Sequence, residues 1–312
     1  MRFNVSTDIS TGGKGQLINM RNNVINNKRS HSLRYRTDKG MGIKYIVLIV
    51  VALFFLFPTV FMFVSSIKNN EMQIISDMGN LRAFIPYGEI GLKNYFDVFQ
   101  RLPFGRFMFN SVFVVGSTVL IGLVINSMLA YALARLRFKG RNFIVLLIIS
   151  LIIIPTEAIV IPLLLIVNLF GWLDSYHVQI IPFMADPFSI FLFYQFFRNI
   201  PKNLDEAAMI DGAGPFRIYW NIIIPLSRPV FATVAILQFI FRWNEFLWPL
   251  MVTRGYEYRP LTVAIQQLFS LDPKMWGDIF AFASMITIPS MIIFLLFQKW
   301  FIHSVASSGI KG

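Results

Sequence analysis

Four ionisable side chains lie inside otherwise apolar stretches of the sequence: Glu157, Asp186, Arg242 and Glu245. If these stretches are buried in lipid, each charge costs roughly 2.5–3.5 kcal/mol near the middle of the bilayer, so contact with lipid is disfavoured. We therefore expect the four side chains to face the interior of a helix bundle, a partner subunit or a watery cavity. Carboxylates in such positions relay protons or line the path of a solute.

The spacing of these residues leaves two interpretations open. Arg242 and Glu245 are three residues apart on one helical face, so they can simply pair with each other. Glu157 follows Pro155, and Asp186 precedes a second proline, so a broken helix at either place can line a pathway. The candidate residues for a translocation pathway are Glu157, Asp186, Asn244 and Glu245.

No other catalytic or metal-binding chemistry is indicated. The chain has no cysteine, which excludes disulfides and cysteine-based metal sites, and His31, His177 and His303 are far apart in the sequence. No nucleophile–base pair stands out. A phosphate-binding loop needs Gly-x-x-x-x-Gly-Lys-Ser/Thr, and Gly13-Lys14 lacks the upstream glycine. We predict no catalytic residues, no metal and no cofactor in this chain.

Composition places the chain among membrane proteins. It is 56% hydrophobic and 14% charged, whereas soluble domains are about 45–50% apolar and about 25% charged. A helix needs roughly 20 apolar residues to cross the hydrocarbon core, and the backbone in lipid must be helical. Six stretches are long enough: Tyr45–Ser65, Ser111–Ala134, Phe143–Phe170, Val178–Phe197, Val230–Val252 and Ile279–Phe301. The predicted fold is an all-α polytopic membrane protein with six transmembrane helices.

The distribution of positive charge predicts the orientation. With the N-terminus inside, nineteen Lys and Arg residues fall on the cytoplasmic side and eight on the other. The positive-inside rule therefore places both termini in the cytoplasm. The net charge of +12 is then explained by topology rather than by nucleic acid. The polar, basic N-terminus is not a cleavable signal peptide.

The predicted organisation follows from these spans. Residues 1–42 form a cytoplasmic, disordered tail or a regulatory segment, and residues 43–66 form the first span. The extracytoplasmic loop 67–110 includes Leu92–Phe99, a short amphipathic helix that lies on the bilayer or on a partner. Residues 111–302 hold the other five spans and a cytoplasmic segment, 198–229, and residues 303–312 form a cytoplasmic tail.

The segment 198–229 has the marks of a short helix with a sharp corner. Asn203 or Asp205 can cap the start of the helix, and acidic residues in the first turn complement the helix dipole. Gly212 and Gly214 can supply the positive φ that ends it. Proline then opens a second helix. Small residues, Ala207, Ala208 and Ala213, give a surface that another protein can approach closely.

In the same segment Glu206-Ala207-Ala208 is followed by Gly212, Ile222 and Pro225, and this pattern resembles the EAA loop of bacterial ABC importer permeases. We call residues 198–229 the EAA segment. Further residues resemble the maltose-transporter-type permeases of the carbohydrate-uptake importers. They are Asn110-Ser111, Ala130–Arg135, Phe138, Gly140-Arg141, Ile161-Pro162-Leu163, Gly171, Leu173, Pro187-Phe188, Gln195–Phe197, Trp243–Leu250 and Gly309–Gly312. Ile224, where the family usually has Leu, is a conservative departure.

This resemblance implies a type I ABC importer permease fold in the bacterial inner membrane, with a cytoplasmic coupling helix. It implies a second homologous permease, two ATPase subunits that bind ATP and Mg, an extracytoplasmic solute-binding protein and a carbohydrate substrate. The chain itself would not be an enzyme. The implied ATPase-coupling residues are Glu206, Ala207, Ala208, Asp211, Gly212, Ala213 and Pro225.

Two alternatives remain. The substrate can be another solute, such as a glycerol phosphate. The chain can also be a proton-coupled carrier with an EAA-like loop, although the sequence has no repeated halves with paired broken helices, as many such carriers do.

Overall fold

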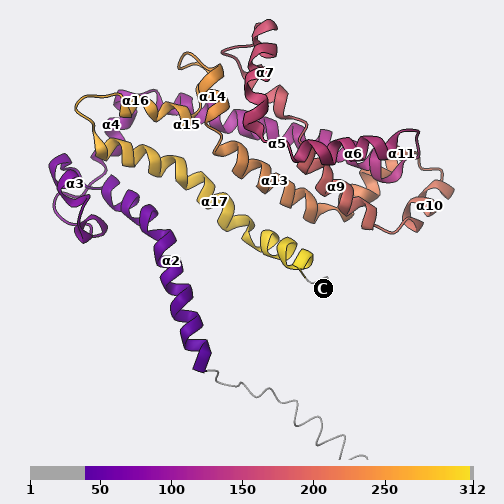
Figure 1. Ribbon diagram of the computed structural model, residues 1–312, viewed down its shortest axis with the longest axis horizontal. Helices are drawn as coiled ribbons and strands as arrows, with labels where there is room; N and C mark the ends of the chain where they lie inside the picture. Colours follow the sequence, from indigo (N-terminus) through magenta and orange to yellow (C-terminus); the bar gives the residue numbers. More distant parts are fainter. Residues whose placement is uncertain (1–38, 310–312) are drawn as a thin grey trace, which may run out of the picture. The chain divides into compact units, whose positions relative to one another are not determined.

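The computed structural model describes residues 39–309 (Figure 1). Within that range the chain is helical and contains no β-strand; a single antiparallel bridge joins Lys68 and Ile90. The all-α prediction is therefore confirmed. In the numbering of Figure 1 the elements are α2 (Lys39–Ser66), α3 (Glu71–Asp77), η1 (Leu81–Phe84), α4 (Lys93–Arg101), α5 (Phe104–Arg135), α6 (Arg141–Ile152), α7 (Thr156–Leu169), α8 (Tyr176–Ile180), η2 (Ile181–Phe183), α9 (Pro187–Asn199), α10 (Asn203–Ile210), α11 (Pro215–Ile218), η3 (Tyr219–Ile223), α12 (Ile224–Leu226), α13 (Arg228–Trp243), α14 (Leu247–Val252), α15 (Leu261–Ala264), α16 (Gln266–Phe269) and α17 (Trp276–Gly309).

Four of the described helices are long and apolar enough to cross a membrane: Lys44–Ser66, Phe104–Arg135, Tyr176–Asn199 and Trp276–Phe297. Two further stretches qualify only as bent pairs. α6 and α7 are bent by 104°, and Pro215–Leu226 and α13 are bent by 79°. By length and composition, the described part of the chain thus has four candidate spans, or up to six if each bent pair counts as one.

The predicted span Phe143–Phe170 is not one straight helix. It breaks between Ile152 and Thr156, because Pro155 lacks a backbone N–H and disfavours a helical conformation at the residue before it. The predicted span Val230–Val252 likewise breaks at residues 244–246, between α13 and α14. Asn244 and Glu245 lie within the second break, and Glu157 lies in the first turn of α7, directly after the first break.

The chain divides into two compact units at Phe57, inside α2. In the first unit, the apolar side chains from Tyr45 to Phe57 are exposed. A helix that is apolar on all sides suits a lipid environment, since no polar face is available for water.

In the second unit, α5, α9, α13 and α17 form the bundle. α5 packs on α9 and α13, and α13 packs on α17. One apolar cluster gathers around the end of α5 that holds Leu133 and includes Phe193, Phe197 and Ile223. Another lies around the opposite end, with Phe104, Phe107 and Phe282. A third, around Trp248, joins α7, α8 and α14.

Helix α5 runs the length of this bundle, from α4 to α10 in Figure 1. Near its start, the Asn110 amide donates to the carbonyl oxygens of Glu257 and Arg259, both at 2.9 Å. The Ser111 hydroxyl accepts from the backbone N–H of Leu261 at 2.9 Å. These bonds fix the 257–261 loop to one end of α5.

Candidate functional site

The EAA segment begins with α10 and a tight corner. The N–H of Ala213 donates to the carbonyl of Ala208 at 2.9 Å, and the N–H of Gly212 donates to that of Met209 at 3.0 Å. These two bonds form a Schellman motif, which requires a left-handed residue at its centre. Gly212 has φ +76°, as this motif demands. Gly214 instead has an extended backbone with φ −75°, so only one of the two glycines provides the left-handed conformation.

Most of α10 faces outward. Among its residues only Asp205 is buried, whereas Glu206, Ala207 and Met209 are exposed and Ile210 is 87% exposed. Asp211 and Gly212, at the corner, are exposed too. The exposed Ile210 side chain leaves apolar surface available to another protein.

The other two alanines of the segment lie differently. Ala208 and Ala213 are half-buried and pack against the apolar cluster that contains Phe197 and Ile218. Beyond the corner, Pro215 begins α11, and Tyr219 and Ile223 in the following π-helical turn are buried. Pro225 is exposed. The inward-facing residues therefore anchor the corner and the outward-facing ones form its surface.

Sequence reasoning missed the main anchor of α10. The N-cap of α10 is Lys202, without a capping side chain, and neither Asn203 nor Asp205 caps it. The Asp205 carboxylate instead lies 3.3 Å from the Arg135 guanidinium, and the two side chains are 9% and 3% exposed. Burial raises the pKa of Asp205 and the Arg135 charge opposes that rise. No local spacing pattern links these two residues, so the sequence carried no signal for the pair.

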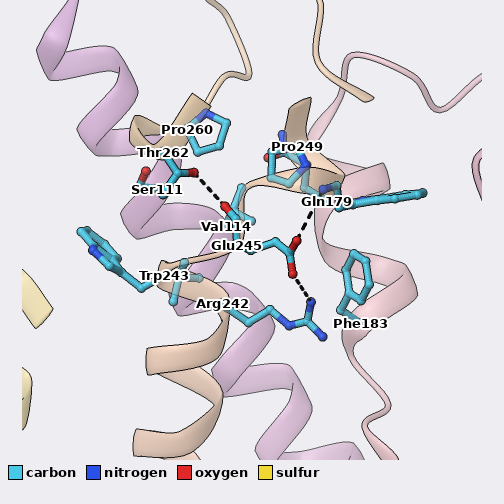
Figure 2. A pocket seen from close by; sticks show the side chains of 12 residues that line it. Ser111, Val114, Gln179, Phe183, Arg242, Trp243, Glu245, Pro249, Pro260 and Thr262 are labelled. Carbon is cyan, nitrogen blue, oxygen red and sulfur yellow. Dashed lines mark hydrogen bonds and ion pairs between the residues drawn. The ribbon is translucent and has the colours of Figure 1, made fainter. Parts of the chain in front are cut away.

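The Arg242–Glu245 pair lies in a pocket between α5, α8 and α13, where Figure 2 shows the two side chains facing each other. The Arg242 Nη1 is 3.6 Å from the Glu245 carboxylate, and the guanidinium lies 4.0 Å above the Phe183 ring. Glu245 also accepts from the backbone N–H of Trp248 at 3.4 Å, at the start of α14, and Thr262 donates to its carbonyl at 2.8 Å. The pair therefore stabilises the break between α13 and α14.

Asp186 caps a helix as well. Its carboxylate accepts from the backbone N–H of Ser189 at 2.8 Å and from the Ser189 hydroxyl, at the start of α9. Gln238 donates to the same hydroxyl at 3.0 Å. The Asp186 N–H donates to Asn126 Oδ1 at 2.9 Å. The carboxylate thus satisfies a free N–H group at the start of α9, a role that Asp followed by Pro at the first helical position could have predicted.

Three neighbouring cavities connect most of the predicted pathway residues, and Phe183 lines all of them. Glu245 lines the pocket of Figure 2 and a cavity of about 60 Å³ that also contains Glu157. Asp186 and Arg242 line a larger, mainly apolar cavity of about 480 Å³ between α7 and α9. Asn244 is exposed, lines none of these three, and donates to the carbonyl of Ile240 at 2.7 Å.

Among the described residues, no group of three or more His, Asp or Glu side chains is arranged to hold a metal ion. The described polar groups instead form caps, ion pairs and inter-helix bonds. These contacts hold the helix ends together around the cavities near Phe183.

Comparison with known proteins gives the family. Residues 119–307 match the family described as "Binding-protein-dependent transport system inner membrane component". The arabinooligosaccharides transport system permease protein AraQ of Bacillus subtilis (strain 168) is 33% identical over 270 residues, which cover 84% of this chain and 93% of the relative. The sn-glycerol-3-phosphate transport system permease protein UgpE of Yersinia enterocolitica serotype O:8 / biotype 1B (strain NCTC 13174 / 8081) is 36% identical over 209 residues, 66% of this chain and 74% of the relative.

A solved structure agrees with these relatives. A chain of a bacterial ABC transporter involved in the import of the acidic polysaccharide alginate superposes with a TM-score of 0.75 and 28% identity. The match covers 86% of this chain and 99% of that one. The helices long enough to span a membrane and the inner-membrane family together indicate a multi-pass protein of the cytoplasmic membrane. The chain therefore belongs to the binding-protein-dependent transport system inner membrane component family, the permease subunits of ABC importers.

Proposed function

We propose that this chain forms half of the translocation pathway of an ATP-driven carbohydrate importer and couples to an ATPase subunit through the EAA segment. The observation that carries the carbohydrate assignment is the fit to nearly the whole permease chain of the alginate importer, at 28% identity. The similarity to AraQ over 93% of that relative supports it. The substrate is then an oligo- or polysaccharide.

The coupling role is supported by the geometry of α10. Its outward face and the corner after it hold the candidate coupling residues Glu206, Ala207, Asp211 and Gly212. Ala208 and Ala213 support that face from behind, and Pro225 is exposed on α12. In this proposal the face docks onto the ATPase subunit, which binds ATP and Mg. This chain performs no hydrolysis and transmits movement only.

The proposed topology counts each bent pair as one span, which makes six. The excess of Lys and Arg on one side puts both termini and the EAA segment in the cytoplasm. The full importer would contain a second permease, two ATPases and an extracytoplasmic solute-binding protein. ATP-driven closure of the ATPases would draw the docking helices together and switch the bundles between inward- and outward-open states.

The proposed pathway runs along the broken helices near Phe183. Glu157, Asp186 and Glu245 line the cavities there, and Asn244 lies beside them at the end of α13. Asp186 and Glu245 are engaged as helix caps, so they shape the wall of the pathway. Glu157 is exposed and, within the described residues, has no hydrogen bond or ion pair, which leaves its carboxylate available to a solute.

The experiment is ATP hydrolysis and uptake by the reconstituted complex with its binding protein, across mono-, oligo- and polysaccharides. We expect hydrolysis to rise with a loaded binding protein, because ATP and the loaded protein must favour the same state. If no saccharide raises hydrolysis but another solute does, the carbohydrate assignment is wrong.

A glycerol phosphate is the second candidate substrate, and the 36% identity to UgpE favours it. Including sn-glycerol 3-phosphate in the same panel separates the two. The proton-coupled carrier is separated by energy source: uptake that persists after ATP depletion would favour it.

A further inference from the structure

Few side chains of α10 face the protein interior, and Ala208 among them is only half-buried. α10 has eight residues, and Asp205 is the one among them that is buried. A helix this short is not stable by itself in water, so its direction depends on what holds it. The buried partner of Asp205 is Arg135, the last residue of α5.

Arg135 holds two separate parts of the EAA segment. Its Nη1 lies 3.3 Å from Asp205 Oδ2, and its Nη2 donates to the carbonyl of Ile200 at 2.8 Å. Ile200 directly follows α9, so one guanidinium contacts both the end of α9 and the first turn of α10. A guanidinium presents several donors in a rigid fork, whereas a lysine ammonium would not fix both directions.

Two further contacts continue this attachment along the same face of α5. The Tyr131 hydroxyl donates to the carbonyl of Pro215 at 2.9 Å, and the Ser127 and Tyr219 hydroxyls are 2.8 Å apart. Ser127, Tyr131 and Arg135 are spaced four residues apart, so they form one stripe on the helix. This stripe contacts the chain on both sides of the Gly212 corner.

We propose that Arg135 and Asp205 are a positioning pair that locks α10 to α5, so that α10 and α5 move as one body when the ATPase moves α10. This inference rests on the proposed function of the EAA segment. The far end of α5 holds the 257–261 loop through Asn110 and Ser111. A movement of α10 therefore reaches the opposite end of the bundle along a single helix of 32 residues.

The pair differs from a purely structural ion pair in what its loss should change. Without the Asp205 charge, the outward face of α10 still carries Glu206, Ala207 and Ile210, so the ATPase subunit still binds. The movement of the ATPase subunit then shifts the loosened α10 without moving α5. Binding is retained, and transport per ATP falls.

The first test compares Asp205→Asn and Arg135→Gln with Asp205→Glu in the reconstituted importer. For Asp205→Asn and Arg135→Gln we expect the ATPase subunit to co-purify in normal amount, hydrolysis to continue, and substrate imported per ATP to fall at least about tenfold. Asp205→Glu keeps the charge and should stay near wild type. Arg137→Gln is the matched control, because Arg137 is exposed, lies outside the EAA segment and has no hydrogen bond or ion pair within the described residues.

The outcomes for the positioning pair and for the proposed function are distinguishable. If wild type couples and Asp205→Asn imports as much per ATP as wild type, the positioning pair is wrong. The positioning role is also wrong if substrate imported per ATP falls as far in Asp205→Glu as in Asp205→Asn. If the wild-type chain retains no ATPase subunit, the proposed function is wrong, and so is the positioning role of Arg135 and Asp205.

A second measurement does not depend on the loss of either charge. The chain has no native cysteine, so Met128→Cys on α5 and Asn203→Cys on α10 can be spin-labelled without background. Both positions are exposed. We expect the distance distribution between the labels to be narrow and equal in the nucleotide-free and ATP-bound importer. A distance that changes between those states would show that α10 moves independently of α5 and would overturn the proposal.

Discussion

Two buried ion pairs in this chain are built differently. Lys68–Asp77 joins residues of one short segment, and the two atoms are 2.8 Å apart. Each partner is also bonded elsewhere: Lys68 donates to the Arg82 carbonyl at 2.9 Å, and Asp77 accepts from the Tyr87 hydroxyl. Arg135–Asp205 joins separate elements at 3.3 Å. Arg135 Nε, Arg135 Nη1 and Asp205 Oδ1 are buried without a hydrogen-bond partner among the described residues, so the 3.3 Å contact is an ion pair and not a hydrogen bond.

The difference separates an ion pair that fixes one short segment from a pair that joins two separate helices. A buried charge is costly unless its remaining donors and acceptors are satisfied, and Lys68–Asp77 meets that condition. Arg135–Asp205 meets it only in part, so its net contribution to stability is smaller. We therefore expect the first pair to matter chiefly for local stability and the second chiefly for coupling.

The largest stability effect is expected for Lys68→Met. This change leaves the Asp77 carboxylate buried without its cation, and removing one partner of a buried pair costs about 3–5 kcal/mol. Hydrogen exchange of the amides in 68–90 measures the local opening free energy. In the Lys68→Met importer that does assemble, the amount of substrate imported per ATP should stay near that of wild type. Exchange in 68–90 identical to wild type would contradict the view that this pair fixes the segment.

Asp205→Asn should cost less stability, about 1–3 kcal/mol, because the group it disturbs is already incompletely bonded. Amide exchange in 200–215 should rise, while exchange in 68–90 is unchanged. If the loss equals that of Lys68→Met, the two pairs are energetically alike and the distinction between them is lost.

Gly212 allows a finer test of the corner between α10 and α11. A Cβ at this position would meet no atom within 4 Å, so the cost of a substitution comes from the positive φ. Gly212→Val should cost about 1–2 kcal/mol and uncouple hydrolysis from uptake, since left-handed backbone disfavours L-residues other than Asn and Asp. Gly212→Asn, which tolerates this conformation, should retain coupling. Normal coupling in Gly212→Val would show that the corner is not needed.

The smallest effect concerns pH. Burial alone would raise the pKa of Asp77, but hydrogen bonds from Lys68 and Tyr87 and the charges of Lys68 and Arg82 outweigh burial, so the pKa lies below its ordinary 3.8. A depressed carboxyl pKa stabilises the folded state fully above the ordinary value. That contribution is lost as pH falls below 3.8 through the depressed pKa. The opening free energy of 68–90, obtained from exchange rates divided by the intrinsic rate at each pH, should therefore be flat between about pH 7 and pH 5 and fall, relative to Asp77→Asn, below about pH 4.

The sequence predicted the elements better than the contacts between them. Apolar length predicted the positions of the four helices that are long enough to cross a membrane, and Pro155 explains the break that turns a further predicted span into a bent pair. The corner at Gly212 was predictable because glycine is the residue that best accepts positive φ. These features depend on a few neighbouring residues, so the sequence shows them directly.

The roles of the charged residues were harder to predict. A carboxylate in the first turn of α10 complements the helix dipole. Because the dipole already explained Asp205, nothing in the sequence indicated its buried contact with Arg135. Asp186 and Glu245 stood out as charges in apolar stretches, although their bonds to the starts of α9 and α14 give them structural roles. Tertiary contacts decide such roles, and no local pattern reports them.

The most direct test of the coupling role measures ATP-driven uptake by the reconstituted importer carrying Ile210→Asp. Ile210 is 87% exposed on the proposed docking face, so a charge there should spare folding and block attachment of the ATPase subunit. Arg137→Gln is again the control. We predict that uptake by wild type requires ATP and that Ile210→Asp loses both the ATPase subunit and uptake. Uptake by wild type after ATP depletion, or full uptake by Ile210→Asp, would contradict the coupling role.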